Sequence, residues 1–69
     1  MELTETKKVL IHLLQKQGVS ENNTVAVILM LQEDEDAMEE LAIWIYDNKP
    51  TEEEIMKEAI AMSDKLPLL

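Results

Sequence analysis

The chain has 69 residues, a length that allows one domain with a small core. Apolar types make up 46% of it and there is no Cys, so disulfides and thiolate zinc sites are excluded. One Gly and two Pro are too few turn residues for a many-stranded β fold, whereas helix formers dominate. We therefore expect an all-α fold, a compact bundle of four short helices forming a single helical domain over residues 1–69.

The net charge is −9, with 15 acidic residues against six Lys and no Arg. Residues 1–32 sum to zero, so the whole excess lies in residues 33–69. Nucleic-acid binding relies on Arg and a basic stripe, and an anionic membrane surface would repel this chain, so we expect neither as a partner. An acidic half of this kind serves solubility or faces a basic or neutral partner.

The N-terminal sequence and the apolar runs bear on location. Met1 is followed by Glu2 and a charged amphipathic segment, which does not resemble a signal peptide. The longest apolar run, residues 25–31, is far too short to span a bilayer. We therefore expect a cytoplasmic protein.

The first helix is predicted over about residues 4–17. Thr4 suits its N-cap, and Gly18 suits the left-handed conformation that follows a helix C-terminus. His12 falls on the polar side near Lys8 and Lys16, so we expect a solvated histidine. At 100° per residue one apolar arc collects Leu3, Val9, Leu10, Leu13 and Leu14.

The second helix is predicted over about residues 21–32, with Ser20 or Asn22 as its cap. Residues 25–31 leave it no polar side, so we expect it to be the central helix, buried on most faces. No Gly or Pro lies between Gly18 and Pro50, so the second and third helices could also run on as one long helix. We favour a break at Glu-Asp-Glu-Asp, residues 33–36, because consecutive acids repel one another in a helix and suit caps.

The third helix is predicted over about residues 36–48 and the fourth over 52–65, followed by a short apolar tail, residues 66–69. Asp34 or Asp36 would cap the third helix, and residues 51–54, from Thr51 to Glu54, match a capping box for the fourth. The third helix shows a core arc of Ala37, Met38, Leu41, Trp44 and Ile45, and the fourth an apolar side of Ile55, Met56, Ala59, Ile60 and Met62.

No arrangement of residues predicts catalysis, a cofactor or a metal. The Ser and Thr residues fall at caps or on helix surfaces, away from any general base. The acidic run does not fit an EF-hand loop, because Met38, Glu39 and Ile45 stand where the loop needs an oxygen ligand, a Gly and a Glu. We therefore expect a protein that is not an enzyme.

Acyl carrier proteins offer a remote comparison, since they are also small, acidic and four-helical. Their signature is Asp-Ser-Leu at the start of the second helix, where the Ser takes the phosphopantetheine arm. This chain has Val19-Ser20-Glu21 at that place and lacks both the Asp and the Leu. A carrier-type function is therefore only a remote alternative.

The third helix carries an apolar residue on its polar side. Ile43 lies opposite the core arc, among Glu39, Glu40 and Asp47, and Tyr46 flanks the same outer region. The C-terminal Leu68 and Leu69 also have no place on the apolar sides of the four predicted helices. These seven residues form the predicted interaction surface.

The predicted function is that of a small non-enzymatic protein-protein interaction or regulatory protein. Its partner is another protein or a second copy of the chain in a homodimer. The alternative is an acidic antagonist, a nucleic-acid mimic or immunity-type inhibitor, whose carboxylates occupy a basic site on an enzyme.

Overall fold

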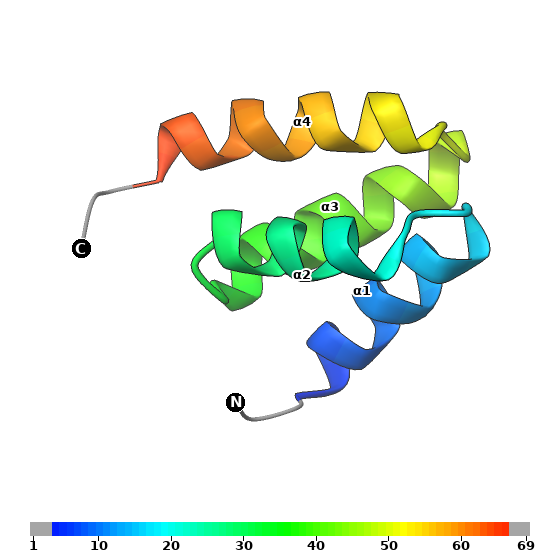
Figure 1. Ribbon diagram of the computed structural model, residues 1–69. Coiled ribbons are helices and arrows are strands. Elements are labelled where there is room, and N and C mark those ends of the chain that lie inside the picture. The colour runs from blue at the N-terminus through cyan, green and yellow to red at the C-terminus, as the bar shows by residue number, and fades with distance from the viewer. Residues whose placement is uncertain (1–3, 67–69) are drawn as a thin grey trace.

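A computed structural model describes residues 4–66, and Figure 1 shows them as four helices joined by short connections. These are α1 (Glu5–Lys16), α2 (Glu21–Met30), α3 (Glu35–Asn48) and α4 (Glu52–Lys65). No strand occurs between residues 4 and 66, and the all-α prediction is confirmed. None of the helices in this part of the chain is long and apolar enough to cross a membrane.

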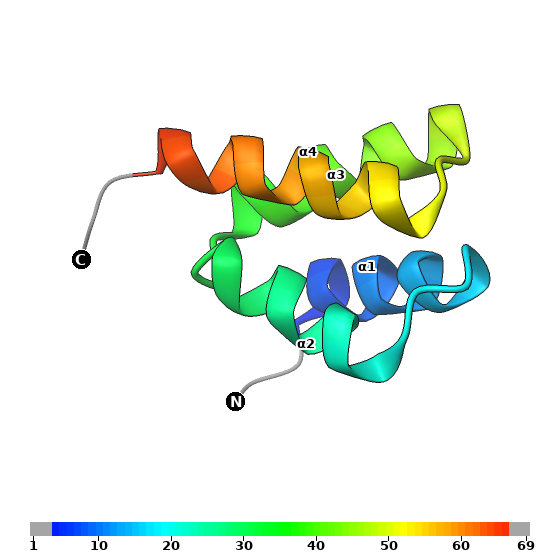
Figure 2. The same cartoon turned by 45° about the horizontal axis from the view of Figure 1, so that its top comes forward.

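The four helices surround one core in the cyclic order α1, α2, α4, α3. Each helix packs against the two neighbours in this order, so α1 contacts α2 and α3 while α4 contacts the same two helices. Figure 2 shows the two helical hairpins as two layers, with α3 and α4 lying above α1 and α2. The most extensive packing is between α1 and α3, which are not neighbours in the sequence.

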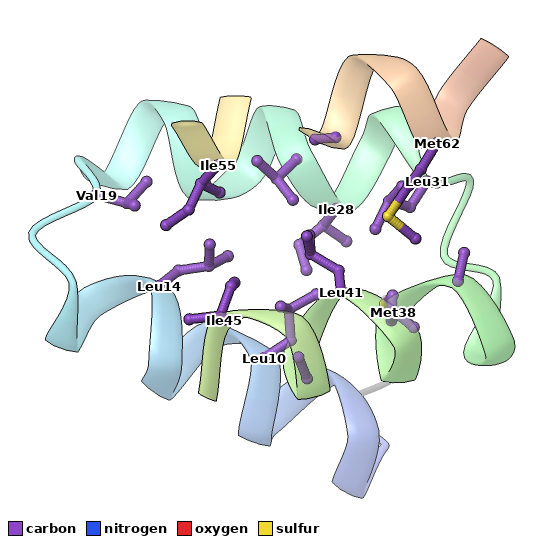
Figure 3. Close-up of a cluster of buried hydrophobic side chains, with 14 residues drawn as sticks. Leu10, Leu14, Val19, Ile28, Leu31, Met38, Leu41, Ile45, Ile55 and Met62 are labelled. Atoms are coloured by element: carbon purple, nitrogen blue, oxygen red, sulfur yellow. The ribbon is translucent and has the colours of Figure 1, made fainter. Parts of the chain in front are cut away.

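The core is aliphatic and draws on all four helices. In Figure 3, Leu10 and Leu14 of α1 and Leu41 and Ile45 of α3 point toward the side chains of α2 and α4. The largest fully buried side chains are Leu10, Leu14, Val27, Leu31, Met38, Leu41, Ile45 and Ile55. Burial of such side chains is the main stabilising contribution that a chain of this size has, since it has no Cys.

The helix starts follow the local sequence signals. The side chains of Thr4, Ser20, Asp34 and Thr51 each accept a hydrogen bond from a backbone N–H in the first turn of α1 to α4. The capping box of α4 is complete, because Thr51 also donates its own backbone N–H to Glu54 Oε1 at 2.9 Å. Gly18 follows α1 with φ +82°, the left-handed conformation that we expected.

A sharp corner separates α2 from α3, so the single long helix does not form. Gln32 and Glu33 adopt φ values of 56° and 53°, two consecutive left-handed residues that are not Gly. The ammonium group of Lys7, on α1, donates a hydrogen bond to Glu33 Oε1 and forms an ion pair with it. This pair joins the first helix to the corner.

Several expectations about burial are wrong. The second helix is not buried on most faces, because Val25 and Leu29 are exposed on its outer side. Ile60 is exposed on α4, although its spacing placed it with the core residues. The buried stripe of α1 instead includes Lys7, whose side chain reaches Glu33, and Val9 lies outside it. The second helix also ends at Met30, two residues earlier than predicted.

Candidate interaction groove between α1 and α3

A groove of about 700 Å³ runs between α1 and α3, and its lining is largely apolar. It lies on the outer side of the helix pair that packs most extensively. The residues that line it are Glu5, Thr6, Lys8, Val9, His12, Leu13, Glu39, Ala42, Ile43 and Tyr46. We refer to this hollow as the α1/α3 groove.

The α1 wall of the groove is formed by one side of that helix. Val9 and Leu13 are one helical turn apart and therefore share this side, while Leu10 and Leu14 enter the core. Val9 is 49% exposed and Leu13 half-buried, so both keep apolar surface in contact with water. His12 is exposed at the same wall, as expected for a solvated histidine.

The α3 wall presents the apolar residues that do not fit the core arc. Ile43 is 55% exposed and Tyr46 is 71% exposed, and both line the groove with the buried Ala42. The exposed position of Ile43, which the helical spacing predicted, is confirmed. An exposed Ile or Tyr is ordinary when it stands alone, but here two of them border a hollow that Val9 also lines.

The outer side of α2 provides a comparison for these residues. Val25 is as exposed as Val9, at 49%, and Leu29, at 57%, is close to Ile43 in exposure. Neither residue lines the α1/α3 groove. Val25 and Leu29 are therefore matched controls: they are as exposed as Val9 and Ile43, but they lie outside the groove.

The two walls differ in charge. The α3 helix contains Glu35, Asp36, Glu39, Glu40 and Asp47 and no cation. Of these, Glu39 lines the groove, and Asp47 lies one turn beyond Ile43 on an exposed part of the helix.

The α1 wall carries cations as well as an acid. Lys8 and Glu5 line the groove and approach each other at 3.9 Å between Lys8 Nζ and Glu5 Oε1. Lys16 is exposed seven residues after Val9 and so lies along the same side of α1. One wall is therefore acidic and the other is neutral to basic.

The structure divides the predicted interaction surface. Ile43, Tyr46 and Glu39 come together in the groove. Glu40 instead borders a smaller hollow of about 190 Å³ between the start of α3 and the end of α4, and Asp47 lines neither hollow. Leu68 and Leu69 lie outside the described residues.

The prediction missed every groove residue on α1 and also Ala42, and the three apolar ones among them had been assigned to the core or to no site. Val9 and Leu13 fall within the apolar arc of α1, and Ala42 was assigned nowhere. The width of the apolar arc on α1 was the signal that could have indicated this. A helix that packs against two neighbours buries the middle of such an arc and leaves its edges exposed.

The ion pair of Lys7 fixes α1 from the side opposite the groove. The Lys7 side chain is only 3% exposed and that of Glu33 is 41% exposed. The hydrogen bond from Lys7 holds the pKa of Glu33 below its ordinary value of 4.5. A buried cation therefore sets the position of α1 against the α2–α3 corner.

The carboxylate of Glu52, at the start of α4, connects α4 to α2. Glu52 Oε2 accepts hydrogen bonds from Ser20 N and Asn23 Nδ2, both at 2.9 Å, and these bonds lower the pKa of Glu52. The starts of α2 and α4 are connected in this way. The acidic residues are thus partly structural and not only a solvated surface.

The described residues contain no arrangement that points to metal chemistry. Between residues 4 and 66, no three His, Cys, Asp or Glu side chains are grouped so that they could hold a metal ion. The groove itself holds one imidazole, from His12, and no Ser or Cys nucleophile. Its shape and lining fit the binding of apolar surface.

Comparison with known proteins gives no matching family model, no significantly similar curated protein and no significantly similar solved structure.

Proposed function

We propose that this chain is a non-enzymatic protein-interaction domain and that the α1/α3 groove is its contact surface. The observation that carries the proposal is the grouping of Ile43, Tyr46 and Val9 around one hollow, each about half exposed or more. Apolar groups that are collected in a concavity bind more surface than the same groups scattered over the molecule.

The energetic argument favours apolar contact over charge as the source of affinity. Each Å² of apolar surface removed from water contributes about 25 cal/mol, whereas an exposed ion pair contributes about 0–1 kcal/mol. Tyr46 adds a large amphipathic side chain with few rotatable bonds, a type that is enriched in the centres of protein interfaces. The acidic residues then steer association and select the partner.

The acidic antagonist is a second candidate function, supported by the unbroken acidic character of α3 and the first turn of α4. In that case carboxylates would provide the contact and binding would weaken steeply with added salt. In the groove function, binding depends on Ile43 and responds only modestly to salt.

Site-specific photocrosslinking tests the groove function whichever protein the partner is. Tyr46 is replaced by the photoreactive benzoylphenylalanine in the full chain, and the chain is irradiated in the cells that produce it. We expect a crosslinked protein of defined mass, which mass spectrometry identifies either as the same chain or as another protein.

The control places the same photoreactive residue at Leu29, which is also accessible but lies outside the groove. We expect the crosslink from position 46 to disappear when Ile43→Asp is added, and position 29 to give no such product. Equal crosslinking from both positions, or none from position 46, would rule out the groove as the contact surface.

A further inference from the structure

We propose that the occupant of the α1/α3 groove is a second copy of this chain, related by a two-fold axis that runs along the groove. This inference rests on the proposed function of the groove. A two-fold axis in that direction turns the second copy over and exchanges left and right. It therefore lays α1 of each copy on α3 of the other.

The charges of the two walls support this crossed arrangement. In each half of the dimer, Lys8 and Lys16 of one copy face the α3 side that carries Glu39 and Asp47 in the other. The two-fold axis repeats the contact, so that every attraction occurs twice. A groove with one acidic wall and one neutral-to-basic wall is complementary to itself in this orientation.

The alternative two-fold axis, perpendicular to the groove, would place α1 on α1 and α3 on α3. It would bring together two α3 helices whose groove side carries Glu39 and Asp47, on a helix that contains no cation. Such a contact juxtaposes like charges and is unfavourable. The charge pattern therefore selects one of the two face-to-face dimers.

The area that a stable dimer needs is a small part of this chain's surface. A specific interface buries upward of roughly 1,000 Å² in total, or about 500 Å² from each partner. That is about a tenth of the 4734 Å² accessible surface of this chain. Ile43, Tyr46 and Val9 line the groove and would be buried in this contact.

Sedimentation equilibrium of the full chain gives the first test. We expect a dimer at micromolar concentration, a monomer for Ile43→Asp and for the milder Ile43→Ser, and an unchanged dimer for Leu29→Asp. Leu29 is the matched control, because it is close to Ile43 in exposure and lies on α2, away from the groove. Circular dichroism verifies that each variant retains its helices.

Charge reversal of each wall tests the crossed arrangement. Lys8→Glu with Lys16→Glu, and separately Glu39→Lys with Asp47→Lys, should each weaken the dimer about tenfold. The second pair makes the chain less negative, so a weaker dimer then reflects the local contacts and not the total charge.

Combining all four reversals in one chain distinguishes the two axes. In the crossed arrangement this variant again places opposite charges together and keeps the net charge at −9, so the native affinity should return. In the like-on-like arrangement the same variant sets Glu against Glu and Lys against Lys, and the dimer stays weak.

Lys57→Glu with Lys65→Glu is the control for total charge, since both residues are exposed on α4. It should weaken the dimer clearly less than reversal of Lys8 and Lys16. An equal loss from both pairs, or failure of the fourfold variant to restore the dimer, would overturn the crossed arrangement.

The two proposals fail in different ways. A native chain that stays monomeric, but crosslinks another protein from position 46, overturns the second copy as occupant and leaves the groove function intact. A dimer that is insensitive to Ile43→Asp places the interface elsewhere and overturns the inference. A monomer that gives no crosslink from position 46 removes both proposals.

Discussion

The buried ammonium group of Lys7 forms an ion pair with an acidic residue at the α2–α3 corner, and this pair contributes to the stability of the molecule. Lys7 is 2% exposed, and its ion-pair partner Glu33 is at the same time one of two corner residues with positive φ. A buried charge that loses its partner is strongly destabilising, whereas a surface charge is not. We therefore expect the Lys7–Glu33 pair to contribute more to the free energy of unfolding than a surface ion pair would.

We predict that Glu33→Gln lowers the free energy of unfolding at pH 7, because the buried Lys7 ammonium group then loses its ion pair with the Glu33 carboxylate. Urea unfolding followed by circular dichroism measures the change. Glu40→Gln is the control, since Glu40 is exposed on α3 and borders the smaller hollow beside α4. Equal stability of the two variants would show that the pair contributes nothing.

The same variant has a defined pH dependence. The pKa of Glu33 in the folded protein lies below its ordinary value of 4.5, so the carboxylate contributes stability above about pH 4.5 and loses it as the pH falls through the folded pKa. The difference in unfolding free energy between native protein and Glu33→Gln should therefore shrink at acid pH. A difference that stays constant between pH 7 and pH 3 would contradict the assignment.

For single residues, the sequence predicts which side chains share a helix face better than it predicts which of them are buried. Ile43 could be placed on the outer side of α3 because helical spacing alone decides which residues share a face. The burial of Lys7 could not be predicted, because it depends on a residue 26 positions away that only the fold brings near. The same limit hid Val9, whose exposure depends on how α3 lies against α1.

Among the elements, α4 has the most complete start. Thr51 Oγ1 accepts a hydrogen bond from the backbone N–H of Glu54 at 3.2 Å, and the Glu54 carboxylate accepts one from the backbone N–H of Thr51 at 2.9 Å. The hydrogen bonds that the backbone N–H and the hydroxyl of Thr51 donate to the Glu54 carboxylate hold the pKa of Glu54 below its ordinary value. Both partners lie close together in the sequence, so the capping box could be found from the sequence alone.

We predict that Thr51→Ala lowers the free energy of unfolding by about 1 kcal/mol, because the first turn of α4 then loses its side-chain acceptor. Thermal and urea unfolding measure the loss. Thr51→Ser keeps the oxygen and should stay close to the native protein. If Ala and Ser are equally destabilising, the methyl group of Thr51 and not the cap is responsible.

Helix ends were predictable where a single side chain decides them. The N-caps of all four helices are residues that the sequence identified, including Ser20 and Asp34, which were each one of two alternatives. The burial of α2 was not predictable in the same way. An apolar run of seven residues has no periodicity that shows which side faces the core, and packing against α1 and α4 leaves the outer side with Val25 and Leu29 in water.

The whole molecule depends on a small core, so a single core truncation has a large effect. A chain of this length is stable by roughly 3–10 kcal/mol in total. Leu41 is fully buried on α3 between the two helical hairpins. Its loss removes a substantial part of that stability.

We predict that Leu41→Ala costs about 2–5 kcal/mol, the range for a cavity in a packed core. Leu29→Ala should change stability by less than about 0.5 kcal/mol, because the same side chain is 57% exposed there. Urea unfolding of both variants at one protein concentration keeps any contribution of association equal. Similar losses at both positions would contradict the assignment of α2 as a half-exposed helix.

The arrangement of the helices was the least predictable level. Composition and caps predicted four helices, but the cyclic order α1, α2, α4, α3 follows from packing between distant segments. The groove exists only because α1 lies beside α3, so its two walls could not be joined from the sequence. Its residues Ile43 and Tyr46 could be predicted because they lie outside the core arc of α3, whereas its α1 residues were not predicted.

The corner between α2 and α3 also bears on how two chains could become entangled. Gln32 and Glu33 both occupy the left-handed region, which disfavours L-residues, and a straight helix would relieve both. In the straightened chain, α3 and α4 would swing away from α1 and α2, and each half would have to complete its core with the other half of a neighbouring molecule. The bond from Lys7 to Glu33 ties α1 to that hinge and so opposes such a domain exchange.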